Sequence, residues 1–374
     1  MSRRSAEGKV EAATGGKPSP MASERFVYQA SPQRVLFGSG TLAELPAEAE
    51  RLGCRRLLVL STPGHRHLAE AAAALLGGRS AALFGEGRMH TPVEVTAAAM
   101  AVVRAQSIDG IVAVGGGSTT GLGKAIALRT DLPQLVLPTT YAGSEMTDIL
   151  GETEAGRKKT VRDRKVVPET IIYDVELTVT LPVRLSVASG MNALAHAVEG
   201  LYAKDGNPIL SLMAEEGIRA LGSALPRIAK NPADRSARRD ALYGAWLCGT
   251  VLAGTVMALH HKLCHVLGGS FGLPHAETHA VVLPHAAAYN AEAAPEAMAR
   301  VARALAVGSA PAGLFDLTRQ SGAPVSLREL GMAEADLDRA ADLAVADPYW
   351  NPRPIERDAV RRLLADAWHG RRPG

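Results

Sequence analysis

The chain has 374 residues, of which 47% are hydrophobic and 21% charged, with a net charge of +3. This length allows two domains with substantial cores, and the composition is that of an ordinary globular protein. The surplus positive charge lies near the two ends, so the body is close to neutral and we expect no nucleic-acid partner. No apolar run approaches the roughly 18 residues that a membrane-spanning helix needs, so we expect no membrane association.

The N-terminal segment 1–22 contains arginines and lysines but lacks the apolar stretch of a secretory signal. We expect a disordered tail here, and Met21 is an alternative start of translation. Cys54, Cys248 and Cys264 are too few and too far apart for a disulfide framework or a CxxC site. They are expected to be buried free thiols in a reducing, cytoplasmic environment.

Residues 23–184 alternate short apolar runs with Ala-rich helical stretches. The runs lie at 34–37, 55–61, 81–84, 110–118, 134–140 and 170–174. Continuous apolar strands separated by helices indicate βαβ units and a parallel sheet that is covered on both faces. This pattern predicts an α/β, Rossmann-like, dinucleotide-binding domain.

The pattern changes near residues 182–186, where strand-like runs end. Helical periodicity dominates from there, for example in a segment with Asn207 as N-cap and Pro208 at its first helical position. We therefore predict an all-α C-terminal domain over residues 185–374, which carries the substrate and catalytic groups.

Two polar turns follow successive strands of the predicted sheet. The first turn opens a helix with glycines that let a pyrophosphate approach the backbone and the helix N-terminus. The second supplies hydroxyl groups at the same carboxyl edge, where ligands of open α/β sheets bind. The predicted cofactor residues are Gly115, Gly116, Gly117, Ser118, Thr139, Thr140 and Ser144.

The first clear strand-to-helix turn ends in Ser61 and Thr62 and has no acidic residue. An acid at this place usually binds the adenosine ribose and rejects a 2′-phosphate. Its absence favours use of both NADH and NADPH. His65 and His67 are interpreted as surface residues of the following helix.

Histidines gather in the second half of the chain, where six of the 11 lie within 26 residues. Such a density is more typical of a functional site than of packing. His261 and His265 share a helix face, and Lys262 lies beside them. The six are His260, His261, His265, His275, His279 and His285.

Asn192 and His196 lie four residues apart, so they share a face of a predicted helix. A carboxylate in the place of Asn192 would make this pair half of a metal site. A neutral amide oxygen is a much poorer ligand for a transition metal. The spacing alone leaves open a metal site, a former metal site or two polar residues on a helix.

Six segments together resemble the maleylacetate reductases, a branch of the iron-containing alcohol dehydrogenase superfamily that is related in fold to dehydroquinate synthase. The resemblance covers about residues 25–372 and implies a Rossmann-like domain, a helical domain and an active site between them. The segments are GGGSTTGLGK, PTTYAGSEMT, LSVASGMNALAH, HHKLCHVLGG, PHAETHAVVLP and NPRP.

The resemblance also indicates where a metal would bind. Metal-using relatives are expected to have an Asp, a His four residues later and two further His. The matching positions are Asn192, His196, His261 and His275. Asn192 thus replaces the anionic ligand, and Gly121 replaces an Asp of the glycine-turn helix. Both departures resemble the pattern of maleylacetate reductases, so we expect no metal.

The activity implied is NADH- or NADPH-dependent reduction of the carbon–carbon double bond of 2-maleylacetate to 3-oxoadipate. Lys159 matches a lysine near the nucleotide ribose, and a small dicarboxylate and a second copy of the chain are the expected partners. A metal-dependent alcohol dehydrogenase, a reductase of another unsaturated oxo-acid and a non-catalytic nucleotide-binding module are the alternatives. The implied catalytic residues are Asn192, His196, His261, Lys262, His265 and His275.

Overall fold

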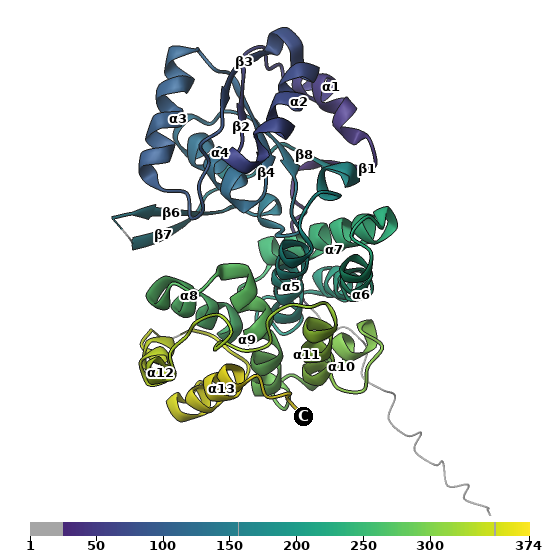
Figure 1. The fold of residues 1–374 in the computed structure, drawn as a ribbon, viewed down its shortest axis with the longest axis vertical. Coiled ribbons are helices and arrows are strands. Elements are labelled where there is room, and N and C mark those ends of the chain that lie inside the picture. Colours follow the sequence, from purple (N-terminus) through teal and green to yellow (C-terminus); the bar gives the residue numbers. More distant parts are fainter. Residues whose placement is uncertain (1–24, 156, 348) are drawn as a thin grey trace, which may run out of the picture.

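The computed structural model describes residues 25–374 apart from positions 156 and 348. The segment predicted to be a disordered tail, 1–22, lies outside the described residues. Figure 1 shows a lobe built on a sheet above a lobe of helices, with α5 and α7 where the two lobes meet.

A six-stranded parallel sheet forms the first domain, and each predicted apolar run supplies one strand. The strand order is β1-β8-β5-β4-β2-β3, so the chain changes direction between β2 and β4. Ligands of open α/β sheets bind at such a switch point, beyond the carboxyl ends of the strands. The strands are β1 (Arg34–Gly38), β2 (Leu57–Leu60), β3 (Ser80–Phe84), β4 (Gly110–Gly115), β5 (Gln134–Pro138) and β8 (Thr170–Asp174).

Helices cover both faces of this sheet, which is why its strands are apolar throughout. On one face, α1 (Leu45–Arg51) and α2 (Arg66–Leu76) pack against β2, β4, β5 and β8. On the other, α3 (Val93–Ala105) and α4 (Gly117–Thr130) bury Val95, Leu122 and Ile126.

A two-stranded antiparallel hairpin, β6 (Ile149–Glu154) and β7 (Arg157–Arg162), stands apart from the main sheet. This hairpin was not predicted from the sequence. The strands were not recognised because they contain many charged residues. In addition, more than half of the described positions of β7 are exposed.

The second domain is helical and is arranged around α5, in which every residue from Ser186 to Gly200 is buried. The predicted combination of a parallel-sheet domain and a helical domain is confirmed. The helices are α5 (Val183–Gly200), α6 (Pro208–Lys230), α7 (Arg235–Gly254), α8 (Leu259–Phe271), α9 (His275–Asn290), α10 (Pro295–Ala304), α11 (Ala310–Gln320), α12 (Leu337–Val345) and α13 (Arg357–His369).

Within the described part of the chain, no single helix has the length and apolar character to cross a membrane. Helices α7 and α8 meet the length and composition criteria only as a pair, across a bend of 98°.

Candidate active site

The glycine turn between β4 and α4 lies against the loop that follows β5. A Cβ atom on Gly116 would come within 2.7 Å of Thr140 Cγ2, and one on Gly115 within 2.4 Å of Thr119 Oγ1. A Cβ on Gly117 would meet only Ser144 Oγ, at 4.0 Å. Two glycines are thus required by close packing, while the third leaves backbone open beside a hydroxyl group, as a phosphate site needs.

Four hydroxyl groups near the carboxyl ends of β2, β4 and β5 are buried without a hydrogen-bond partner. Buried hydroxyls without partners are uncommon, and they point to a missing ligand. Three of them had been predicted from the sequence, and Thr119 had not. The four are Ser61, Thr119, Thr139 and Ser144. Their position at the switch point and their polarity fit a dinucleotide.

Ser61 and Thr62 directly follow β2, and the backbone N of Gly87 donates to the Ser61 carbonyl oxygen at 2.9 Å. Thr62 Oγ1 lies 2.9 Å from His65 Nδ1, so this pair caps the turn after β2. Gly121 leaves room for Thr91, whose Oγ1 would lie 2.4 Å from a Cβ at position 121. Lys159 is exposed on β7.

Lys124 of α4 binds the second polar turn, which follows β5. Its Nζ donates to the carbonyl oxygens of Ser144, Thr147 and Ile149 at 2.6, 2.7 and 3.0 Å. Burial lowers the pKa of Lys124 to about 7, against the attraction of Glu145 and Asp148. This lysine therefore holds the two walls of the cofactor site together.

The loop after β5 also reaches the helical domain. The Tyr141 backbone N donates to Ser189 Oγ of α5 at 3.3 Å, and Gly143 packs so closely on α7 that its Cβ would lie 2.9 Å from Gly249 Cα. The backbone of Ala142 hydrogen-bonds His196. One loop thus borders both the hydroxyl-lined site and the histidines, which brings the two predicted sites together.

Six imidazoles form a connected group on α5, α8 and α9. His279 lies at its centre, with ring centroids 4.6 Å from His275, 4.8 Å from His260 and 5.0 Å from His261. The residues of the group are His196, His260, His261, His265, His275 and His279. His279 belonged to the predicted dense segment but had not been assigned a role.

The six histidines of the group differ in their exposure to solvent. His265 is exposed and His275 is half-buried, whereas His260 and His279 are fully buried. Burial lowers the pKa of His260 to about 3 and lowers the pKa of His279 and His196 well below the usual value, helped by the neighbouring imidazoles. His265 and His275 therefore form the accessible side of the group, and His196, His260 and His279 lie deeper.

Two of the predicted residues and one histidine of the dense segment lie outside this group. Lys262 pairs with the exposed Asp347, at 3.4 Å, and lies over the ring of Tyr349. His285 packs edge to face on Phe315. Lys159 belongs to the sheet domain. Asn192, by contrast, lies one turn before His196 on α5, and its buried Oδ1 has no partner.

Glu199 is a site residue that sequence reasoning missed. Its Oε2 accepts a hydrogen bond of 2.6 Å from His261 Nδ1, while His261 Nε2 lies 2.9 Å from His196 Nδ1. Burial would raise the pKa of Glu199, but the hydrogen bond and charge of His261 outweigh this and bring it to about 2. The available signal was a Glu three residues after His196 on one helix.

At the positions where the resemblance predicts four metal ligands, the set is incomplete in this chain. Asn192 offers a neutral amide, and the nitrogens of His196 and His261 that face each other are hydrogen-bonded. A group of three ligands with all atoms within 4.8 Å occurs once among the described residues, and it is not formed by His196, His261 and His275.

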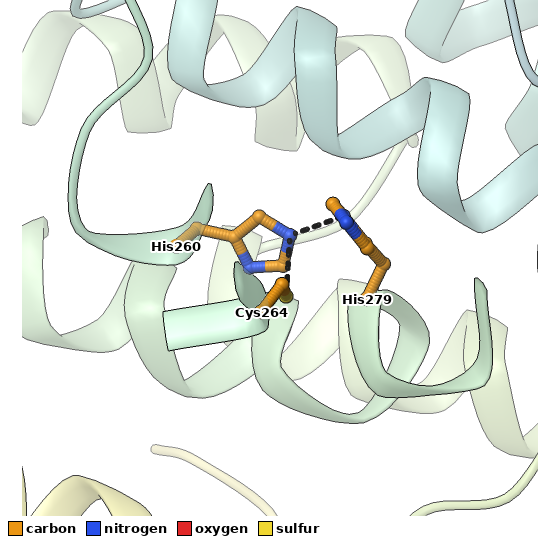
Figure 2. Close-up of side chains that lie close together, drawn as sticks. All are labelled: His260, Cys264 and His279. Atoms are coloured by element: carbon orange, nitrogen blue, oxygen red, sulfur yellow. Dashed lines mark hydrogen bonds between the residues drawn. The ribbon is translucent and has the colours of Figure 1, made fainter. Parts of the chain in front are cut away.

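That one group consists of His260, Cys264 and His279, which Figure 2 shows converging from α8 and α9. His260 Nε2 lies 2.9 Å from His279 Nδ1 and 3.6 Å from Cys264 Sγ. The outer nitrogens, His260 Nδ1 and His279 Nε2, have no partners, although metal-bound histidines usually donate through this atom. Because these three residues could hold a metal ion, the expectation of an enzyme without metal is not confirmed.

Comparison with known proteins identifies the class. The sequence-family model for iron-containing alcohol dehydrogenase matches residues 32–175. The family model for the C-terminal part of the Fe-containing alcohol dehydrogenase family matches residues 186–368. The chain belongs to the iron-containing alcohol dehydrogenase family.

Within this family, similar proteins include maleylacetate reductases, as the sequence motifs had indicated. That of Burkholderia cepacia is 58% identical over 93% of this chain and 99% of its own length, and that of Rhizobium sp. (strain MTP-10005) is 57% identical over the same shares. The crystal structure of maleylacetate reductase from Agrobacterium tumefaciens has a TM-score of 0.91 at 57% identity, covering 94% of this chain and 100% of that one. The predicted resemblance is confirmed.

Proposed function

We propose that the chain is a maleylacetate reductase, which uses NADH or NADPH to reduce the double bond of 2-maleylacetate to 3-oxoadipate. The observation that carries this proposal is the identity of 58% to such an enzyme over nearly the whole of both chains. The geometry supports it, because a hydroxyl-lined dinucleotide site adjoins a group of imidazoles through one loop.

The reaction needs a hydride and a proton on neighbouring carbons. When bound, NADH or NADPH supplies the hydride to the alkene carbon β to the ketone. The electron pair of the double bond then moves toward the ketone, giving an enolate, and a proton added to the adjacent carbon completes the product. The protein must therefore provide hydrogen-bond donors where negative charge develops and a proton source close by.

The imidazole group meets these needs with this chain's own residues. His265 and His275, at the accessible side, are placed to hold the substrate carboxylates. Asn192 and His196 lie deeper, beside the loop that borders the cofactor site. An amide at position 192 also avoids the repulsion that a carboxylate would exert on a dianionic substrate.

The proposed reaction takes no step through a metal. Support comes from Asn192 and from the hydrogen bond between His196 and His261, which occupies the inward nitrogens. The family name and the His260–Cys264–His279 group argue the other way. Metal content and the effect of a chelator on turnover decide the point.

The remaining parts of the proposal concern partners and location. The substrate is a small dicarboxylate, neither nucleic acid nor membrane is a partner, and the enzyme acts as a homodimer in the cytoplasm. Three cysteines that are all free and buried suit a reducing compartment.

The test is consumption of NADH and of NADPH with 2-maleylacetate, run with and without EDTA. We expect turnover with both cofactors, identification of 3-oxoadipate as product, and unchanged rates after chelation. Absence of turnover with maleylacetate, together with oxidation of simple alcohols, would instead support the alternative of an alcohol dehydrogenase.

A further inference from the structure

A carboxylate that is completely buried lies directly behind the imidazole group. Glu199 has 0% exposure and accepts hydrogen bonds from His261 Nδ1 at 2.6 Å, the His260 backbone N at 2.9 Å, the Ala258 backbone N at 3.0 Å and Tyr202 Oη at 3.3 Å. The ring of His261 makes the shortest of these bonds. A buried charge is tolerated when it is paired and hydrogen-bonded.

The bonds of Glu199 determine which nitrogen of His261 carries hydrogen. An ionised carboxylate only accepts hydrogen bonds, so His261 Nδ1 must donate. In the neutral ring Nε2 is then the acceptor, and it lies 2.9 Å from His196 Nδ1. The orientation of one ring nitrogen is thus set by the partner of the other.

Both ends of this chain of contacts come from α5. Glu199 and His196 are three residues apart and project from the same side of the helix, with the ring of His261 between them. The same carboxylate accepts from backbone N–H groups at the start of α8. The ring of His261 and the helix that carries it are therefore fixed by one residue, which itself does not reach the cleft.

We propose that Glu199 is a positioning residue of the reductase, which acts through His261 by holding its ring in the Nδ1–H form with Nε2 directed at His196. This inference rests on the proposed function, since it assigns a role within that reaction. It differs from a purely structural role because its effect on turnover passes through a single imidazole.

The test combines Glu199→Gln with His261→Ala, singly and together, and uses steady-state kinetics with maleylacetate. We expect Glu199→Gln to lower kcat about 10- to 100-fold, as for loss of an orienting partner, with little change in the KM for NADH. In the His261→Ala background the same change should cost less than about twofold. Tyr202→Phe, which removes another bond to the same carboxylate, is the matched control and should keep wild-type kcat.

A spectroscopic measurement makes the inference independent of activity. In ¹⁵N NMR of the imidazole nitrogens, assigned by comparison with His261→Ala, His261 should be protonated at Nδ1 in the wild type and lose this preference in Glu199→Gln. If Glu199→Gln does not fold by circular dichroism, Glu199→Asp, which shortens the reach to His261, is measured instead.

Equal losses of kcat in both backgrounds, or an unchanged His261 tautomer in the folded variant, would overturn the role of Glu199. Failure of the wild type to reduce maleylacetate would refute the proposed function instead, and the NMR result would still decide how His261 is held.

Discussion

At the scale of single residues, the deep end of the imidazole group is close to uncharged. Burial lowers the pKa of His196 well below the usual value, with a further contribution from the neighbouring imidazoles. Asn192, one turn away, contributes a neutral amide whose buried Oδ1 has no partner. Glu199 is ionised but lies behind His261 and is fully bonded. A dianion entering here meets donors and acceptors rather than an exposed negative charge.

Restoring the carboxylate should change this balance. We expect Asn192→Asp to lower kcat/KM for maleylacetate at least about tenfold, about 1.4 kcal/mol, because the new charge repels the substrate. It should also raise the affinity for Fe²⁺ or Zn²⁺, since an Asp and a His four residues apart make good ligands. Kinetics and metal content by mass spectrometry measure both effects. Asn192→Leu is the uncharged control, and a gain of metal in that variant would contradict the explanation.

The residue after β2 should control the choice of cofactor. With Ser61 and no acid at this place, we expect efficiencies with NADH and NADPH within roughly tenfold, about 1.4 kcal/mol. Ser61→Asp should raise the KM for NADPH at least about tenfold more than that for NADH, because an acid repels the 2′-phosphate. Initial rates at varied cofactor concentration test this. A wild-type preference of roughly a thousandfold, about 4 kcal/mol, would refute dual use.

At the scale of elements, the loop between β5 and β6 unites the two domains. Lys124 holds it from α4, and its glycine Gly143 (φ 78°) packs on the backbone of α7. The left-handed conformation and the close approach both require glycine. Because the loop borders the cofactor and the imidazoles alike, its position should affect stability and activity together.

Gly143→Ala should therefore destabilise the protein more than a change of conformation alone explains. A Cβ at this place would lie 2.9 Å from Gly249 Cα and 3.2 Å from Ala245 O. Gly53 has a similar φ of +74° with open space around it, so Gly53→Ala measures the conformational cost, about 1 kcal/mol. We expect Gly143→Ala to lose at least about 2 kcal/mol more in urea unfolding, as overpacking does. Equal losses would show that the contact with α7 is unimportant.

The sequence predicted some elements well and others poorly, for physical reasons. The inner strands β2, β4, β5 and β8 are fully buried and the edge strands β1 and β3 are partly buried, so each predicted strand is a continuous apolar run between helices. The β6–β7 hairpin is less buried, and β7, which is rich in Arg and Lys, has the composition of a loop. The apolar pattern of a sequence indicates which elements are buried. It therefore does not predict a strand that is stabilised mainly by pairing with its neighbouring strand.

At the scale of the whole molecule, the site could be predicted only as two separate halves. The glycine turn and the dense histidines are each local in the sequence, so each can be recognised from the sequence alone. Their union depends on contacts between distant residues, such as Tyr141 with Ser189 and Glu199 with His261, which are 48 and 62 positions apart. Lys262 shows the converse, because it is adjacent to His261 in sequence but faces Asp347. Lys262 was assigned to the site because it lies next to His261 in the sequence, whereas Glu199, which contacts His261 in the fold, was missed.

The buried imidazoles should also make the protein sensitive to mild acid. Burial lowers the pKa of His260 to about 3 and that of His285 to about 4, and it lowers the pKa of His196 and His279 in the same direction, from 6.5 in an exposed residue. Below pH 6.5 the unfolded chain therefore binds more protons than the folded one. Stability is unaffected by these groups above pH 6.5 and falls as the pH drops from there toward the folded values.

His260 and His285, with pKa values of about 3 and about 4, should each remove about 1 kcal/mol between pH 7 and 5.5. His285 allows the effect to be tested away from the site, because its ring contacts Phe315 and not the imidazole group. We expect His285→Gln to recover about 1 kcal/mol of this loss in urea unfolding at the two pH values, with kcat at pH 7 unchanged. If the variant loses as much stability as the wild type over this range, His285 is not kept neutral by burial and the same account fails for the rings of the site.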